Sequence, residues 1–454
     1  MKGDFIGQGL CPLPVFASPP QADVAIARYD GRRVTGDRGR RGAGGKEAFM
    51  SKVTVLGGCG VVGTIAAQTL ASSGLFSAVA IADREVAQAR KLARKLGRGK
   101  ASAIELDADS PKSIKKAVEG SSVVLNCVGP FYRYAPTILK AVIESGINYV
   151  DVCDDFDATE KLLEMDKDAR KAGVSALIGM GSSPGVANVL VRFCADHLLD
   201  RIEAVDIYHA HGGEPLEGPA VVKHRIHSMK MGIPMFLKGR FTTVRMFEES
   251  GRALEEDVDF ADVGRYRVYA YPHPETITLP KHLKGVKRVT NLGLVLPPAY
   301  AELIKAMVRL GMADEEPIAV EGRKVVPLEF AVAFILSRRQ QLMDEAGLNE
   351  PMGCLKIVVK GFKDGESSTY VFSMSSRGQG MGEGTGVPAA LGTILMATGK
   401  ITRKGVNPPE ACVKPMELLE LARSRVSLGE KKGLPIVIEH IDKRGKSQRL
   451  DVFG

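Results

Sequence analysis

Residues 53–63 read V-T-V-L-G-G-C-G-V-V-G, a β-prone apolar run that ends in Gly58-x-Gly60-x-x-Gly63. A helical pattern of small apolar residues follows directly. In such a strand–turn–helix unit, one glycine makes the tight turn, one lets the backbone approach a pyrophosphate, and one lets the helix pack closely on the strand. The start of the helix then offers free N–H groups to the phosphates. The stretch therefore predicts a dinucleotide-binding site.

The second predicted strand ends at the residue expected to meet the ribose. Apolar residues 78–82 lead to Asp83, and Arg84 follows. An acidic side chain at this strand end accepts from the ribose hydroxyls of NAD, although a helix cap before Glu85 is the alternative interpretation. Arg84 is suited either to stack on adenine or to meet the 2′-phosphate of NADP. Asp83 favours NAD and Arg84 favours NADP, so the sequence leaves this choice open.

The composition is that of an ordinary globular protein. The chain has 454 residues, 44% hydrophobic and 25% charged, which is long enough for two domains. We find no apolar run near the ~18 residues that suggest a membrane span. The net charge of +9 is spread thinly and gives little support to nucleic-acid binding. Seven scattered cysteines without a C-x-x-C pair indicate reduced thiols in the cytoplasm, without disulfides or a zinc site.

Residues 1–49 differ from the rest of the chain. They hold four prolines before residue 21 and then a Gly/Arg-rich stretch without periodicity, so we expect a disordered extension. A secretory signal is not indicated, and acidic residues disfavour an organelle transit peptide. Met50 leads straight into the first strand, and we expect it to be the natural start. Mass spectrometry tests this expectation, because a native peptide from residues 20–45 would contradict it.

Strand and helix patterns alternate between residues 50 and 200, which predicts a doubly wound parallel sheet. After residue 200 the alternation gives way to strands of a mostly antiparallel sheet with helices between them. Helices return near residues 389–397 and 415–425, and a hairpin closes the chain. We therefore expect an α/β protein with three parts: an NAD(P)-binding domain at 50–200, an inserted α+β substrate and dimerisation domain at 201–378, and returning helices with a terminal hairpin at 379–454.

An acidic cluster follows the predicted strand at 149–152. Ligands of open parallel sheets bind beyond the carboxyl ends of the strands, and crowded carboxylates raise one another's pKa, which suits proton transfer. We therefore take Asp151 and Asp154 as candidate catalytic residues, with a solvated helix cap as the alternative. Cys153 is a third candidate catalytic residue, which either lines the nicotinamide pocket or is a spectator thiol. The loop 179–188 either presents N–H groups to a ligand or only caps a helix.

The second domain holds the densest polar clusters. Lys223, His224 and Arg225 are candidates for binding a substrate carboxylate, although basic side chains of this kind more often form a solvated face. A zinc interpretation of His209-x-His211 lacks matching cysteines, so we expect no metal. The sequence His273-Pro-Glu275 is a further candidate for the lip of the pocket.

The strand ends together resemble the saccharopine dehydrogenase family. The motifs, in order, are G-G-C-G-V-V-G, A-D-R at 82–84, N-C-V-G-P-F at 126–131, N-Y-V-D-V-C-D-D at 148–155 and S-P-G-V-A-N at 183–188, with G-T-G-V-P-A-A-L-G at 384–392 and G-V-N-P-P-E at 405–410. The resemblance spans roughly residues 52–425, although the middle-domain motifs match poorly. It implies a Rossmann domain with an inserted substrate domain. It also implies cofactor contacts from Gly58, Gly60, Val61, Val62, Gly63, Asp83, Arg84, Asp107, Asn126, Val128, Gly129 and Pro130.

The family includes saccharopine reductases, lysine dehydrogenases and carboxynorspermidine-type enzymes. The resemblance therefore implies an NAD(P)-dependent oxidoreductase that moves hydride to or from the C–N centre of an amino-acid- or polyamine-derived substrate. It also implies a homodimer, with a carboxylated amine or imine as its small-molecule partner. The thinly spread charge and the lack of a long apolar run lead us to expect neither nucleic acid nor a membrane as a partner. An enoyl-reductase-like member of the family and a non-catalytic NAD(P)-binding regulator are the alternatives.

Overall fold

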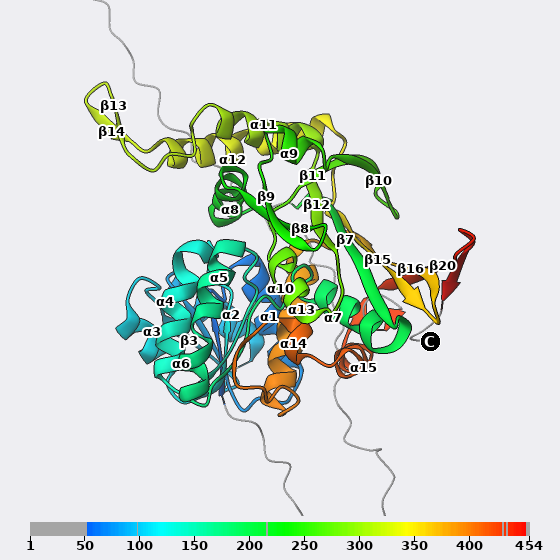
Figure 1. Cartoon of the computed structure of the whole chain (residues 1–454). Helices are drawn as coiled ribbons and strands as arrows, with labels where there is room; N and C mark the ends of the chain where they lie inside the picture. Colours follow the sequence, from blue (N-terminus) through cyan, green and yellow to red (C-terminus); the bar gives the residue numbers. More distant parts are fainter. Residues whose placement is uncertain (1–51, 98, 215–216, 429–430, 433–434, 451–454) are drawn as a thin grey trace, which may run out of the picture.

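The computed structural model describes residues 52–97, 99–214, 217–428, 431–432 and 435–450. The predicted extension 1–49 and the start at Met50 lie outside these residues. The chain forms two lobes, each built around its own β-sheet (Figure 1). Within the described residues, no helix combines the length and apolar character needed to cross a membrane.

The first lobe contains a seven-stranded parallel sheet in the order β17-β6-β5-β4-β1-β2-β3. Its strands are β1 (Lys52–Leu56), β2 (Val79–Asp83), β3 (Ala101–Glu105), β4 (Ser121–Asn126), β5 (Asn148–Asp151), β6 (Ser175–Leu177) and β17 (Gly405–Asn407). The chain runs outward from β1 to β3 and then returns to place β4 on the other side of β1. This reversal opens a crevice at the carboxyl ends of β1 and β4, which is where such sheets bind dinucleotides.

Helices cover both faces of this sheet, as the alternating pattern predicts. They are α1 (Val61–Ser72), α2 (Val86–Leu96), α3 (Pro111–Val118), α4 (Phe131–Glu144), α5 (Phe156–Glu164) and α6 (Asp166–Lys171). From its helical pattern the sequence predicts one helix at 158–172, but the structure has two helices there, α5 and α6, because Met165 leaves the helical conformation with φ −80° and ψ 3°. Ser110 caps α3, since its side chain accepts the N–H of Ser113.

The second lobe contains a ten-stranded mixed sheet. Its strands are β7 (Arg201–Gly212), β8 (Ile233–Leu237), β9 (Arg240–Val244), β10 (Glu256–Phe260), β11 (Gly264–Ala270), β12 (Arg288–Leu296), β15 (Met352–Lys363), β16 (Glu366–Arg377), β20 (Ile436–Ile441) and β21 (Ser447–Leu450). Only β7 and β12 pair in parallel; the other described pairs of this sheet are antiparallel. The sequence patterns missed β8, β10 and β12, which are short or buried on both faces.

Alternation along β7 separates the two cores of this lobe. Val205 and Ile207 face α7 (Val186–Phe193) and α10 (Glu275–His282). Tyr208 and Ala210 face the opposite side, where three helices pack: α8 (Pro219–Lys230), α11 (Pro298–Arg309) and α12 (Pro327–Glu345). Because successive side chains alternate, His209 lies on the same face as Val205 and Ile207.

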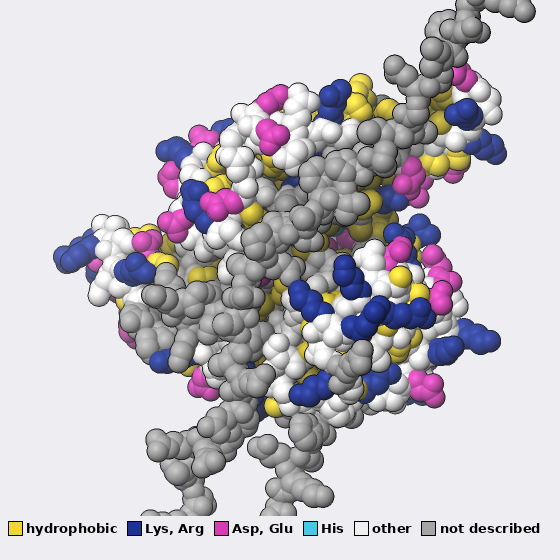
Figure 2. Space-filling model, turned by 180° about the vertical axis from the view of Figure 1, so that it is seen from behind, with side chains coloured by type: hydrophobic (Ala, Val, Ile, Leu, Met, Phe, Trp, Pro, Cys, Tyr) yellow, Lys and Arg dark blue, Asp and Glu magenta, His cyan; other side chains and the backbone are white. Residues whose placement is uncertain are grey.

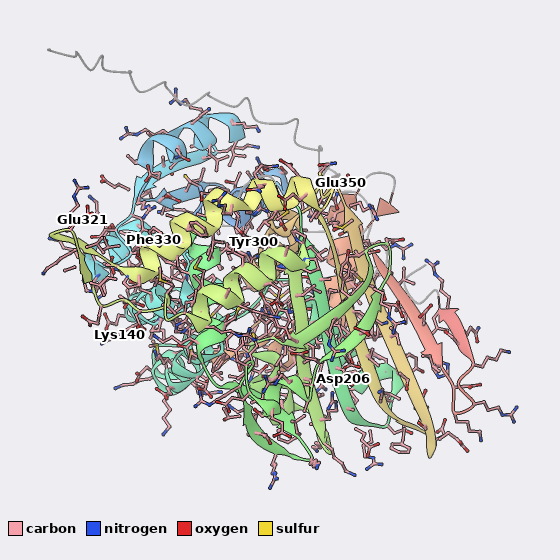
Figure 3. The ribbon with its side chains drawn as sticks, turned by 90° about the horizontal axis from the view of Figure 1, so that it is seen from above. Lys140, Asp206, Tyr300, Glu321, Phe330 and Glu350 are labelled. Atoms are coloured by element: carbon pink, nitrogen blue, oxygen red, sulfur yellow. The ribbon has the colours of Figure 1, made fainter. Side chains whose placement is uncertain are left out.

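A small two-stranded hairpin stands apart from both cores. It pairs β13 (Ile318–Val320) with β14 (Arg323–Val325) between α11 and α12. Glu321 lies at its tip and projects beyond the body of the molecule, far from Glu350 (Figure 3). Tyr300 of α11 lies inward, fully buried.

The C-terminal segment returns to the first lobe, as expected. Helix α13 (Met381–Ala397) packs along α1, and the contact is close because a Cβ at Gly386 would lie 2.7 Å from the carbonyl oxygen of Val62. The short α14 (Pro409–Cys412) and α15 (Pro415–Arg425) follow. Between α13 and α14, strand β17 adds an edge to the parallel sheet, which the sequence patterns did not predict. The terminal hairpin β20–β21 extends the second sheet instead.

Candidate functional site

The glycine turn after β1 is shaped by two kinds of close approach. Gly57 adopts a φ of +71°, a conformation that favours glycine. A Cβ at Gly63 would lie 2.2 Å from the carbonyl oxygen of Gly57, whereas a Cβ at Gly60 would meet nothing closer than 3.4 Å. Gly63 thus serves helix–strand packing, while Gly60 faces open space at the start of α1. This helix has no side-chain cap and no acidic residue in its first turn, which fits the diphosphate of a dinucleotide.

Asp83 lies against this turn. Its carboxylate accepts the N–H of Cys59 at 2.9 Å and the N–H of Glu85 at 3.1 Å, and a carboxylate has further lone pairs for ribose hydroxyls. The side chain of Arg84 is 85% exposed and lies 3.6 Å from Glu85. The two residues assigned to NAD and NADP are therefore adjacent and both accessible.

Hydrogen bonds of the Asn126 side chain fix the loop that follows β4. The side-chain oxygen accepts the N–H of Val128 at 3.0 Å, and the side-chain amide donates to the hydroxyl of Tyr149 at 2.9 Å. A Cβ at Gly129 would lie 3.7 Å from Ala220 at the start of α8, so this loop contacts the second lobe. The tip that ends in Pro130 therefore lies between the cofactor crevice and the other lobe.

Two of the three candidate catalytic residues lie beneath the site. Asp151 is fully buried and accepts the N–H groups of Cys153 at 3.0 Å and Gly179 at 2.7 Å, so it ties two loops together. Burial raises the pKa of the Asp151 carboxyl to about 6. Cys153 is also fully buried, and burial raises the pKa of its thiol well above the usual range. Neither is among the described residues that line the cavity between the lobes.

That cavity has a volume of about 220 Å³. Both lobes contribute its walls, with Asp154 and Ser183 from the parallel-sheet lobe and most of the polar groups from the other. Its titratable lining includes Asp154, His209, His211, Glu214, His224, Arg225 and His273. Seen from behind, lysine and arginine side chains gather over the lower lobe (Figure 2).

His224 sits between two carboxylates. Its Nδ1 lies 2.6 Å from Asp155 and its Nε2 lies 3.6 Å from Asp154. Burial lowers the pKa of His224, but the two carboxylates more than offset this and raise it to about 9. Burial raises the pKa of Asp154 to about 6 despite the opposing effect of His224. The pair therefore provides a protonated imidazole beside a carboxylate at neutral pH, a combination suited to proton transfer.

The three predicted substrate-binding residues do not all lie on the same face of helix α8. Val221, His224 and Arg225 line the cavity, because residues three and four apart share one helix face. Lys223 lies on another face and forms an ion pair with Glu329 of α12. The structure thus brings His224 and Arg225 to the cavity, and it does not bring Lys223 there.

Arg225 is part of a buried charge network. It pairs with Glu217, which also accepts from the hydroxyl of Tyr300 and lies 3.2 Å from Arg339. Arg339 lies 3.9 Å from Glu214. The positive charges of the two arginines are balanced by the negative charges of the two glutamates. The charge that Arg225 presents to the cavity is therefore partly neutralised.

Asp154, His224 and His273 also offer ligand atoms within 4.8 Å of one another. The same spacing serves a shared proton, and His224 already has carboxylate partners on both ring nitrogens. We therefore assign this group to proton handling, and the absence of a metal stays a prediction.

Sequence reasoning did not anticipate α8. The signal was available, because Val222, Ile226 and Met229 recur at helical spacing and are buried, and Pro219 is suited to the first turn. The charged residues of the cluster K-H-R-x-H lie between these apolar positions and make the helical period difficult to recognise. The close approach of Glu275 to Ser183 of the other lobe had no sequence signal.

Comparisons with known proteins agree with this geometry. Residues 53–177 match the saccharopine dehydrogenase NADP binding domain, and residues 181–426 match the saccharopine dehydrogenase C-terminal domain. The chain is 27% identical over 376 residues to carboxyaminopropylagmatine dehydrogenase of Synechocystis sp., an alignment that covers 79% of this chain and 92% of that protein. It is 22% identical over 392 residues to carboxynorspermidine synthase of Vibrio cholerae, covering 77% and 89%.

A solved structure supports the fold. Apo saccharopine dehydrogenase (L-Glu forming) from Saccharomyces cerevisiae matches with a TM-score of 0.59 at 17% identity, covering 83% of this chain and 99% of that one.

The fold and the site define a class of protein. It is a two-lobed dehydrogenase whose dinucleotide crevice lies between β1 and β4, where the strand order reverses. The chain belongs to the saccharopine dehydrogenase family. It is an NAD(P)-dependent oxidoreductase, and the expected family, fold class and cofactor class are confirmed.

Proposed function

We propose that this oxidoreductase interconverts an imine and a secondary amine in a substrate that carries a carboxylate and a second cationic group. The observation that carries the proposal is the His224 imidazole, held between Asp154 and Asp155 on the wall of the cavity. Imine reduction needs a proton at nitrogen, and amine oxidation needs a base there. The names of the two relatives, which denote carboxylated polyamine derivatives, support the same class of substrate.

The cavity has complementary charges for such a molecule. Arg225 supplies a cationic group for the carboxylate. Glu214 and Glu383 both line the cavity, close to Gly380. The carboxylate of Glu383 accepts the N–H of Gly380. A Cβ atom built on Gly380 would lie 3.1 Å from the Cγ of Glu214. These two carboxylates support binding of an ammonium or guanidinium tail.

The residues of the chain bind, orient and move protons. The Gly57–Gly63 turn and the start of α1 hold the diphosphate, and Asp83 with Arg84 meets the ribose. Bound NAD or NADP supplies the hydride acceptor or donor. His224 gives a proton to the imine nitrogen during reduction. Asp154 and Asp155 keep the imidazole charged, and Asp155, which lies 2.6 Å from Nδ1, orients it. In the reverse direction the same pair accepts the proton of the amine. Asp151 and Cys153 position the loop that carries Asp154.

The test is reductive coupling of an amine with an aldehyde. Agmatine and L-aspartate β-semialdehyde condense to an imine whose reduction gives a carboxyaminopropyl amine. We expect NADPH or NADH oxidation that requires both compounds, with the coupled product identified by mass spectrometry. Diamines and lysine-derived aldehydes complete the panel. Tight cofactor binding without turnover of any amine or imine would contradict the proposal.

We also propose that the protein is a cytoplasmic homodimer. The six described cysteines are free thiols, which suits a reducing compartment. Leu310, Ile318, Val320 and Phe330 expose between 46% and 76% of their surface around the β13–β14 hairpin, which supports association of two copies there. Light scattering coupled to gel filtration checks the dimer, and a monomer at micromolar concentration would contradict it.

A further inference from the structure

Glu275 is a buried acid without a cationic partner among the described residues, and it joins the two lobes. It begins α10 in the second lobe and is fully buried. Its Oε1 accepts from the hydroxyl of Ser183, which belongs to the loop after β6 in the first lobe. Ser183 itself lines the cavity. Burying a charged carboxylate costs free energy unless it is paired. A buried carboxyl in this position therefore points to a functional role.

The other oxygen of Glu275 faces His273. His273 Nδ1 and Glu275 Oε2 lie 3.8 Å apart, and both atoms are buried without a hydrogen-bond partner among the described residues. Hydrogen bonds between such atoms lie near 2.7–3.2 Å, so a small side-chain rotation closes the gap. Unpaired buried polar atoms are uncommon in native proteins, and two that face each other indicate a contact made during function.

His273 connects this acid to the candidate catalytic pair. A ligand atom of His273 lies within 4.8 Å of those of Asp154 and His224, and His273 lines the cavity. Its ring is fixed by stacking on His209 at 5.2 Å and by an edge contact with Tyr271 at 5.1 Å. An imidazole held this way accepts a proton at one nitrogen and releases another from its second nitrogen.

We propose that His273 and Glu275 form a proton relay, in which Glu275 stores the proton exchanged with the substrate nitrogen. This inference rests on the proposed amine–imine chemistry. During amine oxidation the nitrogen proton passes to Asp154 or His224, then to one nitrogen of His273, and the proton on the other nitrogen passes to the Glu275 carboxylate. Imine reduction runs the same transfers backwards. No electrons move in these steps, and each proton released is accepted.

The environment of His273 and Glu275 favours the protonation states that the relay needs: a neutral imidazole and a carboxyl that can gain and lose a proton. Burial lowers the pKa of His273 well below its usual range, so the ring is neutral and free to accept. Burial raises the pKa of Glu275 to about 7, opposed by the hydroxyl of Ser183, so the acid exchanges protons near neutral pH. The other titratable or charged groups around the pair are His209, His211, His224, Arg225, Tyr271, Asp154 and Glu410.

The decisive variant is Glu275→Gln, which keeps the shape and the contact with Ser183 but cannot store a proton. We expect kcat to fall about tenfold or more, with KM for NADPH within about twofold of the parent. We also expect the ionisation near pH 7 to disappear from the kcat–pH profile. Glu275→Asp, which keeps a titratable carboxyl, should restore that ionisation.

Two controls separate a relay from a structural role. Glu410 is also buried, with a pKa also raised to about 7, but it binds Asn188 and does not line the described cavity. Because its charge helps to raise the pKa of Glu275, Glu410→Gln should keep the ionisation in the kcat–pH profile and move it only to lower pH. Ser183→Ala removes the bridge between the lobes and leaves the relay in place. If Ser183→Ala abolished the ionisation as Glu275→Gln does, the bridge and not the relay would explain the effect.

A readout independent of turnover keeps the relay testable by itself. In ¹⁵N-histidine NMR of the NADP⁺-bound protein, Glu275→Gln should shift the ring-nitrogen signals of one of the eight histidines. His273→Asn should remove the same signals, and Glu410→Gln should leave them in place. Unmoved signals together with a parental pH profile would overturn the relay. A parent protein that turns over no amine or imine would instead count against the proposed function, and NMR would still decide the relay.

Discussion

The glycine turn after β1 and helix α8 belong to different lobes and are built differently. The turn offers backbone N–H groups and open space, so its function depends on residues adjacent in the chain. Helix α8 contributes His224 and Arg225, whose protonation and orientation depend on Asp154, Asp155 and Glu217 from distant segments. A backbone site can therefore be predicted from a short motif, whereas a site made of side chains can be predicted only when their partners are known.

The largest effect should come from breaking the side-chain site. Asp154→Asn and His224→Gln should each lower kcat by about 10²–10⁴-fold, the usual contribution of general acid–base catalysis, with little change in cofactor affinity. A neighbouring pair provides the control, since His227 lies 3.3 Å from Asp157 and neither lines the described cavity. His227→Gln should keep kcat within about twofold. Equal losses in His224→Gln and His227→Gln would contradict the assignment.

The next effect should come from the backbone site. Gly60→Val places a side chain in the open space at the start of α1 and should weaken NADPH binding about 10- to 100-fold, the loss of one or more charge-assisted hydrogen bonds. Fluorescence titration measures it, and the melting temperature should change little. Gly63→Ala is the matched variant, because its Cβ would clash with Gly57; it should lower the melting temperature. Unchanged NADPH affinity in Gly60→Val would refute the site.

A smaller effect should appear in the choice of cofactor. Asp83→Ala should raise the ratio of kcat/KM for NADP over NAD by about tenfold, because the ribose hydroxyls of NAD lose a charged acceptor worth about 1.5–3 kcal/mol. Arg84→Ala should change the ratio in the opposite direction. Steady-state kinetics with both cofactors gives the ratio, and an unaltered value in both variants would place the choice elsewhere.

The smallest effect should be on stability. The pKa of His224 rises from 6.5 to about 9 on folding, so its protonation stabilises the fold fully below pH 6.5, and this contribution is lost as pH rises through about 9. The loss should be on the order of 1–3 kcal/mol. Asp154, with a pKa raised to about 6, titrates below this window. Thermal melts at pH 6.5 and 9.5 should show a smaller decrease for His224→Gln than for the parent; equal decreases would contradict the ion pairs.

Sequence reasoning predicted the first lobe more fully than the second. The period of apolar strands and the turn glycines located β1 to β6, because βαβ units bury continuous apolar runs. They also located most of the helices between these strands, although α2 was not predicted and α5 and α6 were predicted as one helix. They did not separate Asp154, which lines the cavity, from Asp151, which is buried beneath it, although both follow the same strand. That distinction depends on Gly179, a residue 28 positions further along, whose N–H binds Asp151.

Local periods and motifs in a fixed order were enough to predict the parallel-sheet lobe, the glycine turn at Gly58–Gly63 and the family. Only the tertiary structure decided which polar residues face the cavity. It turned Lys223 toward Glu329 and His224 toward Asp154, and it set His273 beside Glu275 and Glu275 against Ser183. The physical reason is that protonation and binding depend on distances of a few ångströms between residues far apart in the chain, which no local pattern encodes.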